Sequence, residues 1–252
     1  MFISIDNIDI NYSEFNSSAD KIILLVHGWG ARIESLKPII NLLKHDYRVI
    51  AVDLPGHGHS SEPKRVFGTE DFSDIIVKFI NALALKDINY IGHSFGGKCG
   101  IFISSSDKYK SIIKKLVLID ASGIKEDLSD KAKRKVKRFK MLKKIYTFFF
   151  GEKNLEKFYK RFGSEDYKNA NGIMRNCLVK IVNEDLTDNL SQIEAPTLLL
   201  WGEKDSDTPL WMGEMMKDII KDSRLVVLDG GHYSYLDDII GVRDNLPKFL
   251  ED

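Results

Sequence analysis

The stretch Ile88–Gly100, INYIGHSFGGKCG, decides the fold. Its apolar start predicts a buried strand, and the residues that follow Gly97 are compatible with a helix. Between them, the residues Gly92-His93-Ser94-Phe95-Gly96 match the pattern Gly-x-Ser-x-Gly. At a sharp turn from strand to helix, this pattern holds the serine hydroxyl away from the sheet and open to a substrate. The motif is short, so the surrounding sequence has to support it.

Continuous apolar runs on both sides of this stretch predict further strands. They cover residues 22–26, 49–52, 88–91, 116–119, 197–201 and 225–228. Runs without polar alternation are typical of strands buried on both faces, as in a parallel sheet. In contrast, residues 2–5 and 8–12 alternate apolar and polar side chains around Asp6-Asn7, which predicts an antiparallel hairpin at a sheet edge.

Helical periodicity fills most of the gaps between these runs. Apolar residues recur at helical spacing over residues 72–83 and, less regularly, over residues 235–250, where Pro247 is expected to introduce a kink. Pro209 fits the first turn of another helix, with Asp207 as a polar cap. The alternation predicts an α/β fold with a mostly parallel central sheet, an N-terminal antiparallel hairpin and helices on both faces.

One long segment interrupts this alternation. Residues 122–195 carry no strong strand signal but contain helical apolar stripes, so they predict a helical insertion. Residues 1–121 and 196–252 then form the core of the fold.

Composition, cysteine count and the length of apolar runs argue against a disulfide-rich or membrane-spanning protein. With 252 residues, 43% hydrophobic residues and zero net charge, the sequence gives no argument for a nucleic-acid partner. Two cysteines, Cys99 and Cys177, are too few for a disulfide framework. No apolar run approaches the roughly 18 residues that span a bilayer, and the N-terminal residues do not match a signal peptide. We therefore expect a cytoplasmic protein.

A serine hydroxyl becomes a useful nucleophile when a base accepts its proton and an acid orients that base. His232 is the only histidine after Ser94, and it follows the last predicted strand in Asp229-Gly230-Gly231-His232. Asp205, directly after the strand at 197–201, is the preferred acid. Asp207 and Asp120 are the alternatives.

Backbone N–H groups aimed at one point would stabilise an oxyanion. We expect one from Phe95, after the serine, and another from Trp29 in His27-Gly28-Trp29-Gly30, which follows the strand at 22–26. His27 is expected to order this loop by hydrogen bonding beside the substrate. The pair His57 and His59 has no accompanying cluster of metal-binding residues, so we predict a structural turn and no metal.

Five motifs together make a resemblance clear. They are HGWG at 27–30, DLPGHGHS at 53–60, GHSFGG at 92–97, WGEKD at 201–205 and GGHY at 230–233. In this order and spacing the chain resembles the α/β-hydrolase fold superfamily, and within it small serine hydrolases with a helical cap. The resemblance implies Ser94 as nucleophile, Asp205 as acid, His232 as base, and Trp29 and Phe95 as oxyanion donors. A serine at position 94 argues against the dehalogenase and epoxide hydrolase branches, whose nucleophile is aspartate.

The expected activity is hydrolysis of a small or medium acyl ester through an acyl-enzyme, without a cofactor. A C–C bond hydrolase acting on ring-cleavage diketones and a slow hydrolase-like receptor remain alternatives, and acyl transfer is compatible with the same residues. Candidate substrate-binding residues are His27, Phe148, Phe149, Phe162, Met174, Arg175 and Tyr233. The sequence identifies neither the substrate nor the oligomeric state.

The predicted insertion carries a strongly basic segment. Residues 131–144 hold nine lysines and arginines and no acidic residue. A solvated helix face is the simplest interpretation. The sharper hypothesis is weak contact of this face with an anionic surface or substrate.

Overall fold

The computed structural model describes residues 1–125 and 165–251, together with residues 134, 137–139, 141–144, 146–147 and 155. Three candidate pocket residues, Phe148, Phe149 and Phe162, lie outside the described residues. The same holds for Lys131, Lys133, Lys135 and Lys140 of the basic segment, so its contact with an anionic surface stays a prediction.

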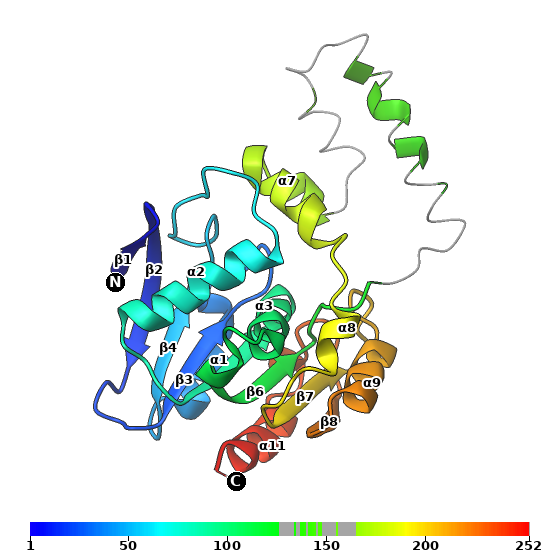
Figure 1. Ribbon diagram of the computed structural model, residues 1–252. Coiled ribbons are helices and arrows are strands. Elements are labelled where there is room, and N and C mark those ends of the chain that lie inside the picture. The colour runs from blue at the N-terminus through cyan, green and yellow to red at the C-terminus, as the bar shows by residue number, and fades with distance from the viewer. Residues whose placement is uncertain are drawn as a thin grey trace.

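A single sheet runs through the described part of the chain (Figure 1). Its strands are β1 (Phe2–Ile5), β2 (Ile8–Phe15), β3 (Ile22–Val26), β4 (Arg48–Val52), β5 (Ile88–His93), β6 (Ile113–Ile119), β7 (Thr197–Gly202) and β8 (Ser223–Leu228). Their order in space is β1-β2-β4-β3-β5-β6-β7-β8. The first two strands form an antiparallel hairpin, β2 pairs antiparallel with β4, and the remaining pairs are parallel. The predicted fold class is confirmed.

Successive side chains along the central strands point to opposite faces of the sheet and fill two separate cores. Leu24 and Val26 of β3 join the core beneath α2 (Thr69–Ala82), α3 (Phe95–Ser105) and α9 (Leu210–Ile219). Ile23 and Leu25 join the core beneath α1 (Lys37–Leu43) and α11 (Ile239–Glu251). Because both faces are covered, these strands need apolar residues at every position, which explains the continuous runs. Short 3-10 turns span Ile33–Leu36 and Lys110–Ile112.

Three local expectations need correction. β8 is an edge strand, and Val227 is 49% exposed, so its apolar run is not buried on both faces. The C-terminal helix is split into α10 (Ser234–Asp237) and α11, and Pro247 lies inside α11. Pro209 occupies the N-cap position of α9, and no side chain caps this helix. The Thr208 hydroxyl before it is engaged in other contacts, which are described below.

The segment between β6 and β7 ends in three helices that the structure describes. These are α6 (Glu165–Asn169), α7 (Gly172–Ile181) and α8 (Thr187–Leu190). α7 lies beyond the end of the sheet and is joined through α8 to β7 (Figure 1). None of the helices formed by described residues is long and apolar enough to cross a membrane.

Candidate active site

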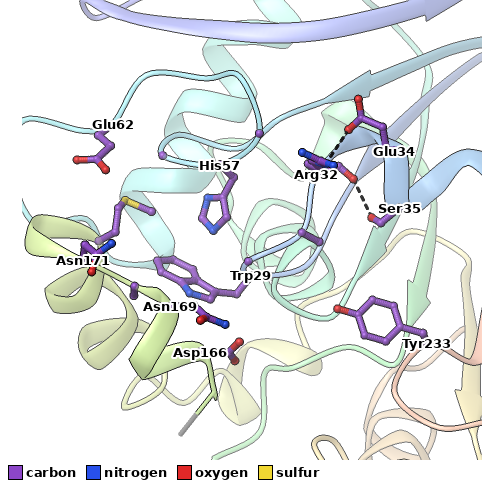
Figure 2. A pocket seen from close by; sticks show the side chains of 16 residues that line it. Trp29, Arg32, Glu34, Ser35, His57, Glu62, Asp166, Asn169, Asn171 and Tyr233 are labelled. Carbon is purple, nitrogen blue, oxygen red and sulfur yellow. Dashed lines mark hydrogen bonds and ion pairs between the residues drawn. The ribbon is translucent and has the colours of Figure 1, made fainter. Parts of the chain in front are cut away.

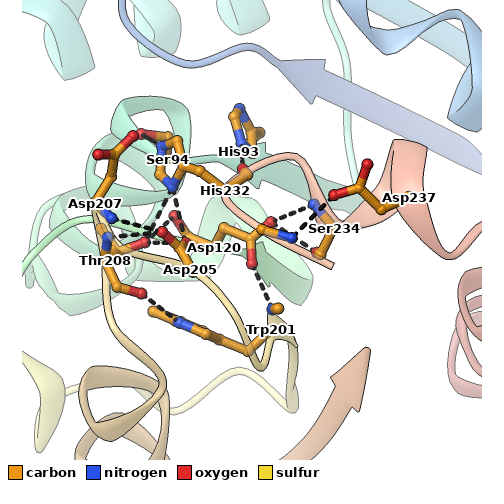
Figure 3. Close-up of polar contacts among 12 residues, drawn as sticks. His93, Ser94, Asp120, Trp201, Asp205, Asp207, Thr208, His232, Ser234 and Asp237 are labelled. Carbon is orange, nitrogen blue, oxygen red and sulfur yellow. Dashed lines mark hydrogen bonds and ion pairs between the residues drawn. The ribbon is translucent and has the colours of Figure 1, made fainter. Parts of the chain in front are cut away.

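Three side chains of the predicted constellation follow three different parallel strands. Ser94 comes directly after β5, Asp205 follows β7 and His232 follows β8. In an open parallel sheet, the loops at the carboxyl ends of the strands meet along one edge. The structure brings the three side chains together at this edge (Figure 3).

Ser94 sits on a strained turn between β5 and α3. Its backbone has φ 50° and ψ −113°, an unusual conformation for a residue with a side chain. The Ser94 N–H donates to the carbonyl of Ile119 at 3.0 Å, which ties the turn to β6. A Cβ atom on Gly96 would lie 2.3 Å from the carbonyl oxygen of Val26, so only glycine lets the turn approach β3 this closely.

A continuous chain of hydrogen bonds links the three side chains. His232 Nδ1 lies 2.8 Å from Asp205 Oδ2, and His232 Nε2 lies 2.9 Å from Ser94 Oγ. An ionised carboxylate can only accept, so the imidazole proton belongs on Nδ1 and Nε2 accepts from the serine hydroxyl. This arrangement is the one needed to remove a proton from Ser94.

Several donors hold the carboxylate of Asp205. The backbone N–H groups of Asp207 and Thr208 donate to Oδ1 at 2.8 and 3.0 Å, and the Thr208 hydroxyl donates to Oδ2 at 2.7 Å. Burial alone would raise the pKa of Asp205, but the hydrogen bonds from His232 and Thr208 outweigh it and lower that pKa. The alternative acid Asp207 is exposed and contributes its backbone to this turn.

Opposing influences also act on His232. Burial favours the neutral ring, but the hydrogen bond and charge of Asp205 favour the imidazolium and raise the pKa of His232 above its ordinary value. His93 Nε2 donates to the His232 carbonyl at 2.7 Å, and burial lowers the pKa of His93 to about 3. The neutral His93 ring therefore supports the loop that carries the base.

Asp120, the third candidate acid, binds the backbone of both loops. Its Oδ1 accepts the Gly202 N–H at 2.8 Å, and its Oδ2 accepts the N–H and hydroxyl of Ser234 at 3.0 and 2.6 Å. Gly202 and Ser234 stand close in sequence to Asp205 and His232. Burial raises the pKa of Asp120 to about 7, although these hydrogen bonds oppose the shift. Asp120 thus connects the two loops. Among the described residues, its carboxylate makes no hydrogen bond to the His232 ring.

The backbone N–H groups of Trp29 and Phe95 are the expected oxyanion donors. No described group accepts a hydrogen bond from the N–H of Trp29 or of Phe95. The two residues are neighbours in space, with ring centroids 5.7 Å apart. His27, the first residue of the same loop, is completely buried, donates through Nδ1 to the Gly28 carbonyl and accepts the Leu54 N–H at Nε2. It orders the loop from inside and does not line the cavity described next.

A cavity of about 820 Å³ adjoins this site (Figure 2). Trp29, His57, Met174 and Tyr233 contribute to its wall, together with residues of the turn before α1 and of α6. Ser94 does not line it, but Trp29 packs on Phe95 beside the serine, and Tyr233 follows His232. Two of the candidate pocket residues, Met174 and Tyr233, are therefore at the cavity.

Arg175 lies elsewhere, although it neighbours Met174 in sequence. It is buried, its Nε donates to the Tyr167 carbonyl at 3.1 Å, and its guanidinium stacks 5.2 Å from the centre of the Tyr167 ring. It does not line the cavity. Within the described ranges, no group of three His, Cys, Asp or Glu side chains is arranged to hold a metal ion.

Sequence reasoning missed two residues of the site. Thr208 contacts Asp205 and lies 3.2 Å from His232 Nδ1, and His93 supports the His232 carbonyl. His93 stands inside the Gly-x-Ser-x-Gly motif, at a position that the pattern leaves open. Thr208 follows the WGEKD motif, and no feature of its own distinguishes it.

Comparison with known proteins places the chain in a family. Residues 21–239 match the family model described as alpha/beta hydrolase fold. Lipase 1 of Psychrobacter immobilis is 27% identical, over 94% of this chain and 79% of its own length. An esterase from Exiguobacterium antarcticum has a similar structure, with a TM-score of 0.78, 23% identity and coverage of 100% of this chain and 99% of the other. A meta-cleavage product hydrolase from Pseudomonas fluorescens gives a TM-score of 0.75, 19% identity and coverage of 100% and 97%. The chain therefore belongs to the α/β-hydrolase fold family.

Proposed function

We propose that this protein is a serine hydrolase that cleaves carboxylic esters through an acyl-enzyme. The observation that carries the proposal is the hydrogen-bond chain from Ser94 through His232 to Asp205, with distances of 2.9 and 2.8 Å. The N–H groups of Trp29 and Phe95 have no acceptor among the described residues, Phe95 directly follows the nucleophile, and Trp29 packs against Phe95. A nucleophile, a base, an acid and an oxyanion site are the groups that acyl transfer requires.

The mechanism follows from the proton positions. His232 accepts the Ser94 proton at Nε2 while Ser94 Oγ attacks the ester carbonyl, and the developing oxyanion accepts hydrogen bonds from Trp29 and Phe95. The imidazolium is stabilised by Asp205 and gives its proton to the leaving alcohol. Water then loses a proton to the same ring and attacks the acyl-enzyme, which releases the acid and restores Ser94.

The names of the relatives are compatible with ester cleavage and with C–C bond cleavage. One relative is named a lipase and a structural neighbour is named an esterase, whereas another neighbour is named a meta-cleavage product hydrolase. Arg175 is the one cation among the candidate substrate-binding residues and could bind the carboxylate of a C–C substrate, but it is buried against Tyr167. We therefore favour an ester, with the segment 122–195 as a cap over the site.

The test is hydrolysis of 4-nitrophenyl esters from acetate to palmitate. We expect turnover with a preference for short or medium acyl chains, and a loss of at least about 10³-fold in kcat for Ser94→Ala. Ser104→Ala is the matched control, because the Ser104 hydroxyl is buried on α3 without a hydrogen-bond partner among the described residues. Wild-type turnover in Ser94→Ala, or no turnover of any ester by the native protein, would contradict the proposal.

A further inference from the structure

His57 projects from the loop after β4 into the wall of the cavity (Figure 2). The residue is only 7% exposed, so most of its ring is packed by protein. Its Nδ1 lies 3.0 Å from the carbonyl oxygen of Pro55. A carbonyl can only accept, so Nδ1 carries a proton and donates it.

The second ring nitrogen is therefore an acceptor. Burial lowers the pKa of His57, while the Pro55 hydrogen bond and the charge of Asp53 only partly oppose the shift. A neutral ring with its proton on Nδ1 presents a lone pair at Nε2 at neutral pH.

This acceptor lacks a hydrogen-bond partner within the described part of the chain. No described residue donates to His57 Nε2. The enclosed side-chain atoms without a partner include Nδ1 of His93 but not Nε2 of His57, so Nε2 is accessible. Since His57 lines the cavity, the accessible part of its ring faces that space. A ligand that covers this atom without donating to it would leave a buried acceptor unpaired, which costs free energy, so a ligand that supplies a donor is favoured here.

The ring is also held in place. The Trp29 indole packs edge-on against it with centroids 4.6 Å apart, and the His27 ring lies 5.5 Å away. The loop itself is fixed by Asp53, whose buried carboxylate accepts the backbone N–H of His59 at 2.9 Å and that of Ile33 at 2.8 Å. A preorganised acceptor can discriminate between substrates because little ordering is needed on binding.

We propose that His57 Nε2 accepts a hydrogen bond from the substrate, and that the preferred substrate is an ester carrying a hydroxyl group. The inference rests on ester cleavage at Ser94 and adds a chemical class to it. A site built to accept a hydrogen bond rejects an analogue that lacks the donor, because the acceptor is then left unpaired.

The test compares esters that differ only in hydroxyl groups. On the acyl side, 4-nitrophenyl 3-hydroxybutyrate is paired with 4-nitrophenyl 3-methylbutyrate, in which a methyl replaces the hydroxyl. On the alcohol side, glyceryl 1-butyrate is paired with propyl butyrate, with acid release followed by titration. In at least one pair we expect the native protein to favour the hydroxylated ester by about tenfold or more in kcat/KM.

Three variants attribute the preference to His57. His57→Phe keeps the ring but removes the acceptor, so the kcat/KM ratio within the preferred pair should fall towards one. His57→Gln can place an amide oxygen near the position of Nε2 and should retain part of the ratio. His59→Phe changes an exposed histidine two residues away and should leave the ratio unchanged. Thermal melting checks that each variant is folded.

The outcomes separate the two proposals. Turnover with no hydroxyl preference in either pair, or a preference that survives in folded His57→Phe, overturns the role of His57 and leaves ester cleavage standing. Absence of turnover for all four esters overturns ester cleavage, and the role of His57 falls with it.

Discussion

At the scale of single residues, two neighbouring aspartates have very different surroundings. Asp205 is buried and accepts hydrogen bonds from His232 and Thr208, whereas the side chain of Asp207 is exposed. The hydrogen bond and charge of Asp205 are the main causes that raise the pKa of His232 against the effect of burial. The two residues therefore form a natural pair of test and control.

Replacing Asp205 by asparagine should lower kcat by about 10³- to 10⁴-fold, because the amide no longer holds the Nδ1 proton and the imidazolium loses its counter-charge. In the native protein, kcat/KM should fall as the pH drops through the raised pKa of His232, since only the neutral ring accepts a proton. In Asp205→Asn burial still lowers that pKa, so the acid limb should move to lower pH. Profiles of kcat/KM against pH measure both effects.

Asp207→Asn supplies the control, with native kcat and a much smaller shift of the acid limb expected, because Asp207 acts on the His232 ring by its charge alone and without a hydrogen bond. An acid limb that stays in place in Asp205→Asn, or one that moves equally in both variants, would show that Asp205 does not set the pKa of His232.

The order of motifs along the chain is enough to predict catalytic residues that follow particular strands. Asp205 and His232 could be chosen because each follows a strand in the order that the family uses, and the structure joins them to Ser94. His57 was interpreted only as part of a turn. Which of its ring nitrogens is left without a described partner depends on which one meets the Pro55 carbonyl, and residue type and spacing do not encode that orientation.

At the scale of elements, the packing of α3 against the sheet depends on Gly96. An alanine here has a better helix propensity by about 1 kcal/mol, but its Cβ would approach the backbone oxygens of Val26 and His27 to 2.3 and 2.7 Å. Backbone atoms of a central strand cannot move aside cheaply. We expect Gly96→Ala to lower the free energy of unfolding by at least about 2 kcal/mol, measured by urea denaturation.

The matched control for this substitution is Gly231→Ala. Gly231 also neighbours the site, but the nearest atom to an added Cβ is Asp237 Oδ2 at 3.9 Å. Gly231→Ala should therefore leave the midpoint of urea denaturation close to that of the native protein. Equal midpoints for Gly96→Ala and the native protein would mean that α3 can shift away from β3.

The positions of the strands could be predicted from the sequence, whereas the exposure of a strand and the ends of the helices could not. A continuous apolar run is a local property, and each run was found as a strand. Whether the strand lies at the centre or the edge of the sheet depends on distant partners, so the exposure of Val227 on β8 was not foreseen. Similarly, Asp238 interrupts the C-terminal helix with φ −124° and ψ 65°, and helical periodicity over residues 235–250 does not reveal that break.

At the scale of the whole molecule, a buried lysine joins the sheet core to the segment between β6 and β7. Lys98 lies on α3, four residues after Ser94, and is 4% exposed. Its Nζ donates to the carbonyls of Ile181 and Glu184 at 2.6 Å each, where α7 ends. Burial lowers the pKa of Lys98, while the charge of Glu184 opposes this. The negative end of the α7 dipole also favours a cation at this position.

Lys98→Met should therefore loosen α7 selectively. The methionine fills a similar volume but leaves two carbonyls at the end of α7 without their charged donor, and hydrogen bonds of this kind contribute about 1.5–3 kcal/mol. Hydrogen exchange should show amide protection in α7 reduced by about tenfold or more, with β5 and β6 unchanged.

Lys180→Met is the control, because Lys180 is an exposed lysine of α7 whose pair with Asp71, at 3.5 Å, contributes little. Loss of protection throughout the sheet would assign Lys98 to the stability of the core, and unchanged exchange in α7 would remove it as the connection between the two parts. Because Met174 of α7 lines the cavity, a selective effect would link this connection on α3 to the shape of the cavity.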